Sequence, residues 1–229
     1  MVEDSPKNAL QRHGFVIVGA VVDATTVETL RCEADRMAEQ SSTRGGSRNL
    51  LQRSELLART AGTEPLLGLA RELLGPRARP TKLTLFDKKP GANWKIRWHQ
   101  DVTITVRQQR EVTGFGAWSV KEGVPHVRPP ASVLEGLVAL RLHLDDTPKT
   151  NGALRVIPGS HLEGRLSRDA IGRLRQANPE VTCAVPAGGV MAMKPLLLHA
   201  SSAADSPSNR RVLHFEYAAE PLPGGLAWA

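Results

Sequence analysis

The residues best suited to chemistry in this sequence are a histidine and an aspartate separated by one residue, in Trp98-His99-Gln100-Asp101. In a β-strand, residues two apart project from the same face, so His99 and Asp101 could converge on one ion. A neutral imidazole and a carboxylate are two thirds of the two-histidine, one-carboxylate site that binds non-haem Fe(II). The pattern alone also fits a surface strand with two polar side chains, so a third ligand is needed.

The third ligand should be a distant histidine, and His199 stands out among the seven histidines of the chain. It follows the apolar run Pro195-Leu196-Leu197-Leu198 and precedes the small residues Ala200-Ser201-Ser202. A histidine at the end of an apolar strand is commonly a core or interface residue. We therefore treat His99, Asp101 and His199 as candidate metal ligands whose assignment depends on the rest of the chain.

The chain that must position these residues begins with helical patterns and continues with short strands. Thr25-Thr26-Val27-Glu28 is a capping-box pattern that opens a helix, and a second helix is expected from Glu64 to Leu74, before Gly75. From residue 80 onward, short apolar segments alternate with turn residues, which predicts a β-sandwich or barrel. The expected strands are 14–18, 81–86, 94–106, 137–144, 153–157, 181–185, 190–193, 196–198 and 211–217.

The segment from Arg107 to Ala131 contains glycine and proline and shows no regular period, so we expect it to be irregular. A loop of that length inside a compact domain is usually a binding loop or a lid. Trp118 and His126 lie within it and are candidates for substrate contacts. We therefore predict a lid at about 107–131.

Arg141 shares its strand phase with Ala139 and His143, opposite Leu140 and Leu142. That phase could line a pocket and give Arg141 a contact with a cosubstrate or substrate. An arginine on a polar exterior face of the sheet fits the same pattern.

The composition is that of an ordinary globular protein, with 41% hydrophobic and 23% charged residues. The net charge of +7 comes from 22 Arg and 8 Lys that are scattered along the chain, and aromatic residues are only 4%. Base stacking needs aromatics, so no nucleic-acid partner is expected. No apolar run approaches the roughly 20 residues that span a bilayer, so no membrane partner is expected. With two cysteines and no signal-peptide pattern, we expect a cytoplasmic protein.

Five motifs occur in order along the chain: Trp98-His99-Gln100-Asp101, Leu144-Asp145-Asp146-Thr147, Asn151-Gly152-Ala153-Leu154, Ile157-Pro158-Gly159-Ser160-His161, and Pro195-Leu196-Leu197-Leu198-His199 with the later Arg210-Arg211. Together they resemble the phytanoyl-CoA dioxygenase family across roughly residues 8 to 219. The resemblance implies a mainly β fold with a double-stranded β-helix (jelly-roll, cupin-like) core and flanking helices. It implies one domain over 1–229, with N-terminal helical support in 1–79 and the core in 80–219.

The resemblance also implies a site. His99, Asp101 and His199 match the family's iron ligands, with 2-oxoglutarate and O2 as cosubstrates. An arginine 11 residues beyond the distal histidine usually grips the far carboxylate of 2-oxoglutarate, which selects Arg210. Ser201 matches a position that can add a hydroxyl to the same carboxylate.

The activity so implied is hydroxylation of an unactivated C–H bond in a small organic metabolite, with release of succinate and CO2. Two alternatives use the same residues: a metal-dependent hydrolase, and a non-catalytic jelly-roll binding module. The sequence identifies neither the substrate nor the oligomeric state.

Overall fold

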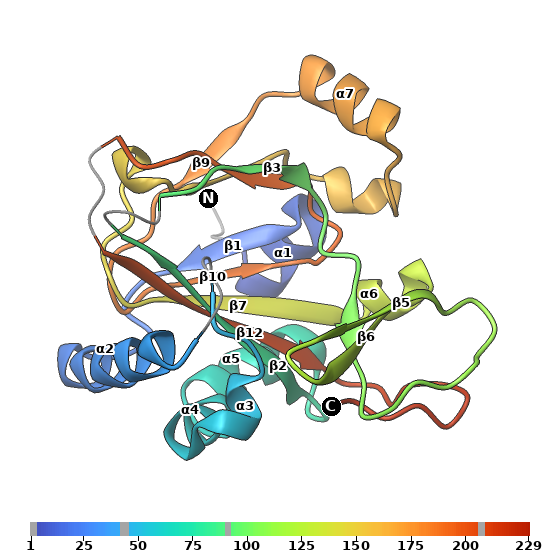
Figure 1. Ribbon diagram of the computed structural model, residues 1–229. Helices are drawn as coiled ribbons and strands as arrows, with labels where there is room; N and C mark the ends of the chain where they lie inside the picture. Colours follow the sequence, from blue (N-terminus) through green and yellow to red (C-terminus); the bar gives the residue numbers. More distant parts are fainter. Residues whose placement is uncertain (1–3, 42–45, 90–92, 206–208) are drawn as a thin grey trace.

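The computed structural model describes residues 4–41, 46–89, 93–205 and 209–229 (Figure 1). None of the described helices is long and apolar enough to cross a bilayer. The helices are α1 (Pro6–His13), α2 (Ala24–Glu39), α3 (Leu50–Arg53), α4 (Glu55–Gly62), α5 (Leu66–Leu74), α6 (Ala131–Glu135) and α7 (Arg168–Ala177). The strands are β1 (Phe15–Val18), β2 (Arg79–Lys88), β3 (Ile96–His99), β4 (Ile104–Thr105), β5 (Gly116–Lys121), β6 (Val124–Arg128), β7 (Leu137–His143), β8 (Leu154–Val156), β9 (Val181–Cys183), β10 (Val190–Met193), β11 (His199–Ser201) and β12 (Arg210–Ala218).

The larger sheet has the strand order β1-β10-β7-β12-β2, and all its neighbouring strands are antiparallel. One face packs against the N-terminal helices, with α2 to α5 below the sheet in Figure 1. Leu213, Phe215 and Tyr217 of β12 belong to this core, and the Tyr217 hydroxyl donates to the carbonyl of Ala61 in α4 at 2.9 Å. Because successive residues of a strand project from opposite faces, the residues of β12 that alternate with these three must face the interior.

The smaller sheet, in the order β3-β11-β8-β9, lies across the interior from the larger one (Figure 1). Its Leu154, Val156 and Cys183 form a second core with Met191 and Met193 of β10. Two antiparallel sheets that enclose one interior are the jelly-roll core that the sequence predicts, and the helices flank it as expected. Residues 1–79 contain α1 to α5, and they also supply β1, which pairs with β10 at the edge of the larger sheet.

The expectation of an irregular segment at 107–131 holds for residues 107–115 but is wrong for residues 116–128. β5 and β6 form a hairpin that extends β4 into a third sheet, in the order β4-β6-β5. Glu122 and Gly123 both have positive φ, at 50° and 80°, as a two-residue hairpin turn of type I′ requires. Pro125 inside β6 hides this strand from pattern reading, since proline weakens a strand prediction.

Two boundaries also differ from expectation. The N-cap of α2 is Asp23, whose carboxylate accepts from the N–H of Thr26 at 2.7 Å, so the helix begins before the capping box that starts at Thr25. Residues 195–198 form a turn closed by the bond from Leu197 N–H to Lys194 C=O, at 3.0 Å. The strand therefore starts at His199, after the apolar run and not within it.

Candidate metal centre and cosubstrate pocket

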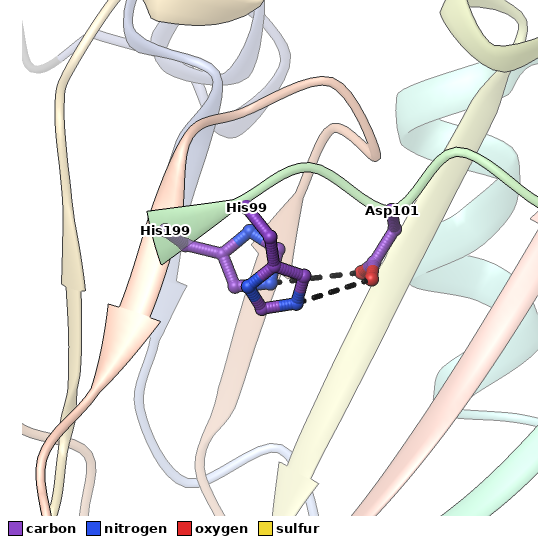
Figure 2. Close-up of side chains that lie close together, drawn as sticks. All are labelled: His99, Asp101 and His199. Atoms are coloured by element: carbon purple, nitrogen blue, oxygen red, sulfur yellow. Dashed lines mark ion pairs between the residues drawn. The ribbon is translucent and has the colours of Figure 1, made fainter. Parts of the chain in front are cut away.

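His99, Asp101 and His199 come together at one end of the interior (Figure 2). β11 pairs with β3 so that His199 lies directly opposite His99, and the two ring centroids are 4.2 Å apart. The Nε2 atoms of His99 and His199 lie 3.7 and 3.8 Å from the two oxygens of Asp101. One ligand atom from each residue lies within 4.8 Å of the others, so a single ion can contact all three.

Both imidazoles are oriented by the backbone. The Nδ1 atom of His99 lies 2.8 Å from the carbonyl oxygen of Arg97, and that of His199 lies 2.8 Å from the carbonyl oxygen of Leu197. A carbonyl only accepts, so Nδ1 carries the proton in each ring and Nε2 keeps a free lone pair. This is the tautomer that a metal ligand requires, and it directs both Nε2 atoms toward Asp101.

Asp101 reaches the centre by a different route from the one expected. β3 ends at His99, so the alternation of a strand does not place the carboxylate. The N–H of Asp101 donates to the carbonyl of Pro195 at 2.9 Å. The buried Gln100 amide donates to the carbonyls of Gly164 and Leu196, and its oxygen accepts from the N–H of Leu166. Gln100 therefore fixes the turn that aims Asp101.

The electrostatics favour the protonation states that bind a cation. Burial lowers the pKa of His199 to about 4, against the opposing attraction of Asp101, so the ring is neutral at pH 7. Burial alone would raise the pKa of Asp101, but His199, His214 and His99 outweigh it and hold that pKa well below its usual range. The side chain of His199 is 4% exposed whereas those of His99 and Asp101 are 39% and 33% exposed, so the centre opens on their side.

Arg210 and Ser201 lie deeper in the same interior. Arg210 is fully buried, and its Nη1 donates to the carbonyl of Gly152 and lies 3.5 Å from the Ser201 hydroxyl. Burial, together with repulsion from Arg141, lowers the pKa of Arg210 to about 9. Its Nε has no hydrogen-bond partner among the described residues. The structure thus brings both residues predicted for the carboxylate anchor to one place.

Arg141 also faces the interior, as its strand phase allowed. Its Nη1 lies 2.9 Å from Nδ1 of His214, its guanidinium lies 5.4 Å from the ring centre of Phe86, and its Nε has no partner within the described chain. A narrow cavity of about 70 Å³ joins these groups to the metal centre. It is lined by Phe86, Ile96, His99, Asp101, Arg141, Leu154, His199, Ser201 and Arg210.

Lys88 is a functional candidate that the sequence reading missed. It ends β2, is fully buried, and its Nζ lies 2.8 Å from the Ser201 hydroxyl and 2.5 Å from the carbonyl of Ser202. Burial, and then Arg210 and Arg141, lower its pKa to about 7. The sequence did contain a signal for this residue. Lys88 alternates with the apolar Leu83 and Leu85 and so projects from the same face as Thr84 and Phe86, but it lies two residues beyond the expected end of the strand.

A family model described as phytanoyl-CoA dioxygenase matches residues 10–212. Among curated proteins, the chain is 24% identical to ectoine dioxygenase of Stutzerimonas stutzeri, over 90% of this chain and 74% of that protein. It is 28% identical to L-proline trans-4-hydroxylase of Streptomyces griseoviridis, over 71% of this chain and 63% of that protein. Against several other ectoine dioxygenases the chain spans about half of their length.

Solved structures confirm the fold class. EctD from S. alaskensis in its apoform has a TM-score of 0.71 at 20% identity, covering 96% of this chain and 79% of that one. The α-ketoglutarate-dependent epimerase SnoN from nogalamycin biosynthesis has a TM-score of 0.69 at 20% identity, covering 95% of this chain and 88% of that one. At such identities the likeness is one of fold.

Proposed function

Because the chain belongs to the phytanoyl-CoA dioxygenase family, we propose that it hydroxylates an unactivated C–H bond of a small organic metabolite, using Fe(II), 2-oxoglutarate and O2 and releasing succinate and CO2. Relatives named ectoine dioxygenase and L-proline trans-4-hydroxylase support a small molecule as the substrate. The observation that carries the proposal is a pair of buried basic side chains, Lys88 and Arg210, that form no ion pair with the described residues and lie near three side chains able to bind a metal.

The three side chains fit a mononuclear iron site. Two neutral imidazoles and one carboxylate form the facial set typical of Fe(II) oxygenases, which leaves the remaining coordination positions open. The backbone contacts of His99 and His199 already leave both Nε2 atoms free to bind an ion, and the pKa of Asp101 is held well below its usual range. When bound, iron together with 2-oxoglutarate supplies the activation of O2 and the oxidising power, while the protein supplies geometry and a dry cavity.

The buried cations fit the dianionic cosubstrate. Within the described chain, neither Lys88 nor Arg210 forms an ion pair, although both are at most 2% exposed. An unpaired buried charge is costly, so an anion that reaches it gains a strong interaction. The planar guanidinium of Arg210 can bind a carboxylate through two N–H groups, and Ser201 and Lys88 supply further donors. We propose that these three residues hold the far carboxylate.

Arg141 lines the same cavity as the three metal ligands, Ser201 and Arg210. Its free Nε and the polarity of its surroundings support a contact with the metal-proximal half of the cosubstrate, or with the substrate itself. Neither a hydrolase that uses the same three ligands nor a binding module with a vestigial metal site requires the buried basic groups of Lys88 and Arg210 beside these ligands.

Anaerobic titration with Fe(II) and 2-oxoglutarate tests the proposal. The weak visible charge-transfer band of the iron–2-oxoglutarate chelate should appear, saturate with 2-oxoglutarate, and be absent from the Asp101→Ala variant. A hydrolase would bind metal without this band. A binding module would bind neither component in this way. Free Cys32 and Cys183 are compatible with the reducing cytoplasm that we propose as its compartment.

A further inference from the structure

A second charged group lies on the interior face of the larger sheet, beyond the cosubstrate recess. Lys82 of β2 pairs in register with Glu216 of β12, and its Nζ lies 2.7 Å from the Glu216 carboxylate. The side chains are only 18% and 7% exposed. A buried ion pair generally adds little to stability relative to apolar residues of the same size. Such a pair needs further partners for its remaining donors and lone pairs to offset the lost hydration, and a bound ligand can supply one.

A histidine of the β5–β6 hairpin lies close enough to this pair for the charges of Lys82 and Glu216 to act on its pKa. His126 of β6 lies opposite Thr105 of β4, and the Thr105 hydroxyl donates to the carbonyl of Thr81, the neighbour of Lys82. His126 is 2% exposed, and neither of its ring nitrogens has a hydrogen-bond partner among the described residues. Buried polar atoms without partners are rare in folded proteins, so this imidazole is left for something that the protein chain does not provide.

The pair is linked to the metal centre. Nε2 of His214 lies 3.4 Å from the Glu216 carboxylate, and Nδ1 of the same ring lies 2.9 Å from Arg141. Arg141 in turn lines the cavity that contains His99 and Asp101. Lys82 lies six residues before Lys88 on β2, and Glu216 lies six residues after Arg210 on β12, so the two charged groups are separated along the sheet.

The donors of this cluster favour an anion. The carboxylate of Glu216 is paired with Lys82 and contacted by His214. Burial alone would lower the pKa of Lys82, but the attraction of Glu216 outweighs burial and raises that pKa above its usual value. The Lys82 ammonium has three N–H donors and uses one on Glu216. Burial, and then Lys82 and Lys121, lower the pKa of His126 to about 4, so the ring is neutral and offers one N–H.

We propose that Lys82 and His126 bind a carboxylate of the organic substrate, and that Glu216 positions Lys82 for this contact. The substrate class is then a small carboxylic acid, held by its carboxylate near the hairpin with its C–H bonds toward the metal centre. This inference rests on the proposed function, because it assigns the substrate of that same site.

The test is a calorimetric titration of the Fe(II)- and 2-oxoglutarate-loaded protein, without O2, with matched acids and amides. L-Proline and L-prolinamide, benzoate and benzamide, and hexanoate and hexanamide differ only in the charge of the group that would meet Lys82. At least one acid should bind, and its amide should bind about 10- to 100-fold more weakly, as expected for the loss of a charge-assisted hydrogen bond.

Three variants locate the effect. Lys82→Met with Glu216→Gln replaces the pair by neutral residues of similar size, so that no buried charge is left unpaired. His126→Phe keeps the ring and removes both nitrogens. Each should weaken binding of the acid about 10- to 100-fold and leave 2-oxoglutarate binding within about 2-fold of wild type. Lys95→Met makes the same charge change at an exposed site and should change neither.

Amides that bind as well as their acids, variants that bind the acid normally, or a panel in which no acid binds would each overturn the assignment. Absence of the iron–2-oxoglutarate band before any acid is added would instead contradict the proposed function. Failure of the substrate assignment and failure of the proposed function are therefore distinguished by separate measurements.

Discussion

Arg210 and Arg211 are consecutive residues of β12, and their guanidinium groups lie on opposite faces of the larger sheet. Arg210 points into the interior and meets the carbonyl of Gly152. Arg211 points toward the helices, where it donates to both oxygens of Asp145, at 2.9 and 2.8 Å, and to Asp35 of α2 at 2.9 Å. The pleat of one strand thus places two adjacent arginines in different surroundings, and we propose that Arg210 binds 2-oxoglutarate while Arg211 stabilises the fold.

Arg210→Ala should raise the apparent KM for 2-oxoglutarate about 10- to 100-fold, because a buried charge-assisted contact is worth about 1.5–3 kcal/mol. Arg211→Ala should leave this KM unchanged and lower the free energy of unfolding by about 3 kcal/mol, since it breaks a mostly buried ion pair. Steady-state kinetics and urea unfolding of both variants measure the two effects. The reverse assignment would show that Arg211 faces the cosubstrate.

Lys88 should take up a proton when 2-oxoglutarate binds above pH 7. Its pKa of about 7 in the ligand-free protein, caused by burial and then by Arg210 and Arg141, leaves it mostly neutral at pH 8. A bound carboxylate raises that pKa and restores the charge. Calorimetry at pH 8 in two buffers of different ionisation enthalpy should give an uptake of close to one proton, falling toward zero at pH 6. Equal uptake by Lys88→Met would assign the proton to another group.

The same depressed pKa has a consequence for stability. The pKa of an unfolded lysine is about 10.4. The burial of the Lys88 charge therefore destabilises the ligand-free protein fully below pH 7, and this destabilisation disappears gradually as the pH rises toward 10. Lys88→Met should therefore gain stability relative to wild type at pH 6.5, and this advantage should shrink at pH 9. Denaturant unfolding at the two pH values measures the difference, and an advantage that grows with pH would contradict the assignment.

Gln100→Leu should weaken Fe(II) binding about 10- to 100-fold, as is typical when an outer-shell partner of a metal ligand is lost. Gln100 contacts no ligand atom; its amide holds Gly164, Leu196 and Leu166 around the turn that presents Asp101. His199→Ala, which removes a proposed ligand, should cost more than this. His13→Ala, at an exposed histidine, is the control. Metal affinity that is normal in Gln100→Leu would mean that the turn holds Asp101 without it.

The β5–β6 hairpin should exchange its amide hydrogens more slowly when substrate binds, if it acts as the predicted lid. Its tip is held by weak contacts: Asn49 donates to the carbonyl of Glu122 at 3.2 Å, and Arg48 and Arg53 lie 3.4 and 3.7 Å from the Glu122 carboxylate. Such exposed pairs contribute about 0.2–1 kcal/mol each. Glu122→Gln should therefore speed exchange across residues 116–128 only in the substrate-free protein. Rates that are equally slow with and without substrate would argue against a lid.

The chemistry of this protein could be predicted from the sequence because it depends on a few residue types at fixed spacing. The His99 and Asp101 pair, the distal His199, and the Arg210 and Ser201 pair are read from order along the chain, and the fold class follows from short strands separated by turns. The family spacing selected Arg210, whereas hydrophobicity alone would have turned Arg211 inward. The structure resolves this conflict, because Leu213, Phe215 and Tyr217 pack against the helices.

The tertiary structure decided what local patterns cannot specify. Asp101 reaches the metal centre through Gln100 and a turn, because β3 stops at His99. Lys88 becomes a buried neighbour of Ser201 only because β2 is held along its whole length by β12. His126 lies opposite Thr105 because the hairpin turn at Glu122 and Gly123 lets β6 pair with both β5 and β4. These relationships depend on strand register between distant segments, and register is set by the packing of the whole sheet, not by any one segment.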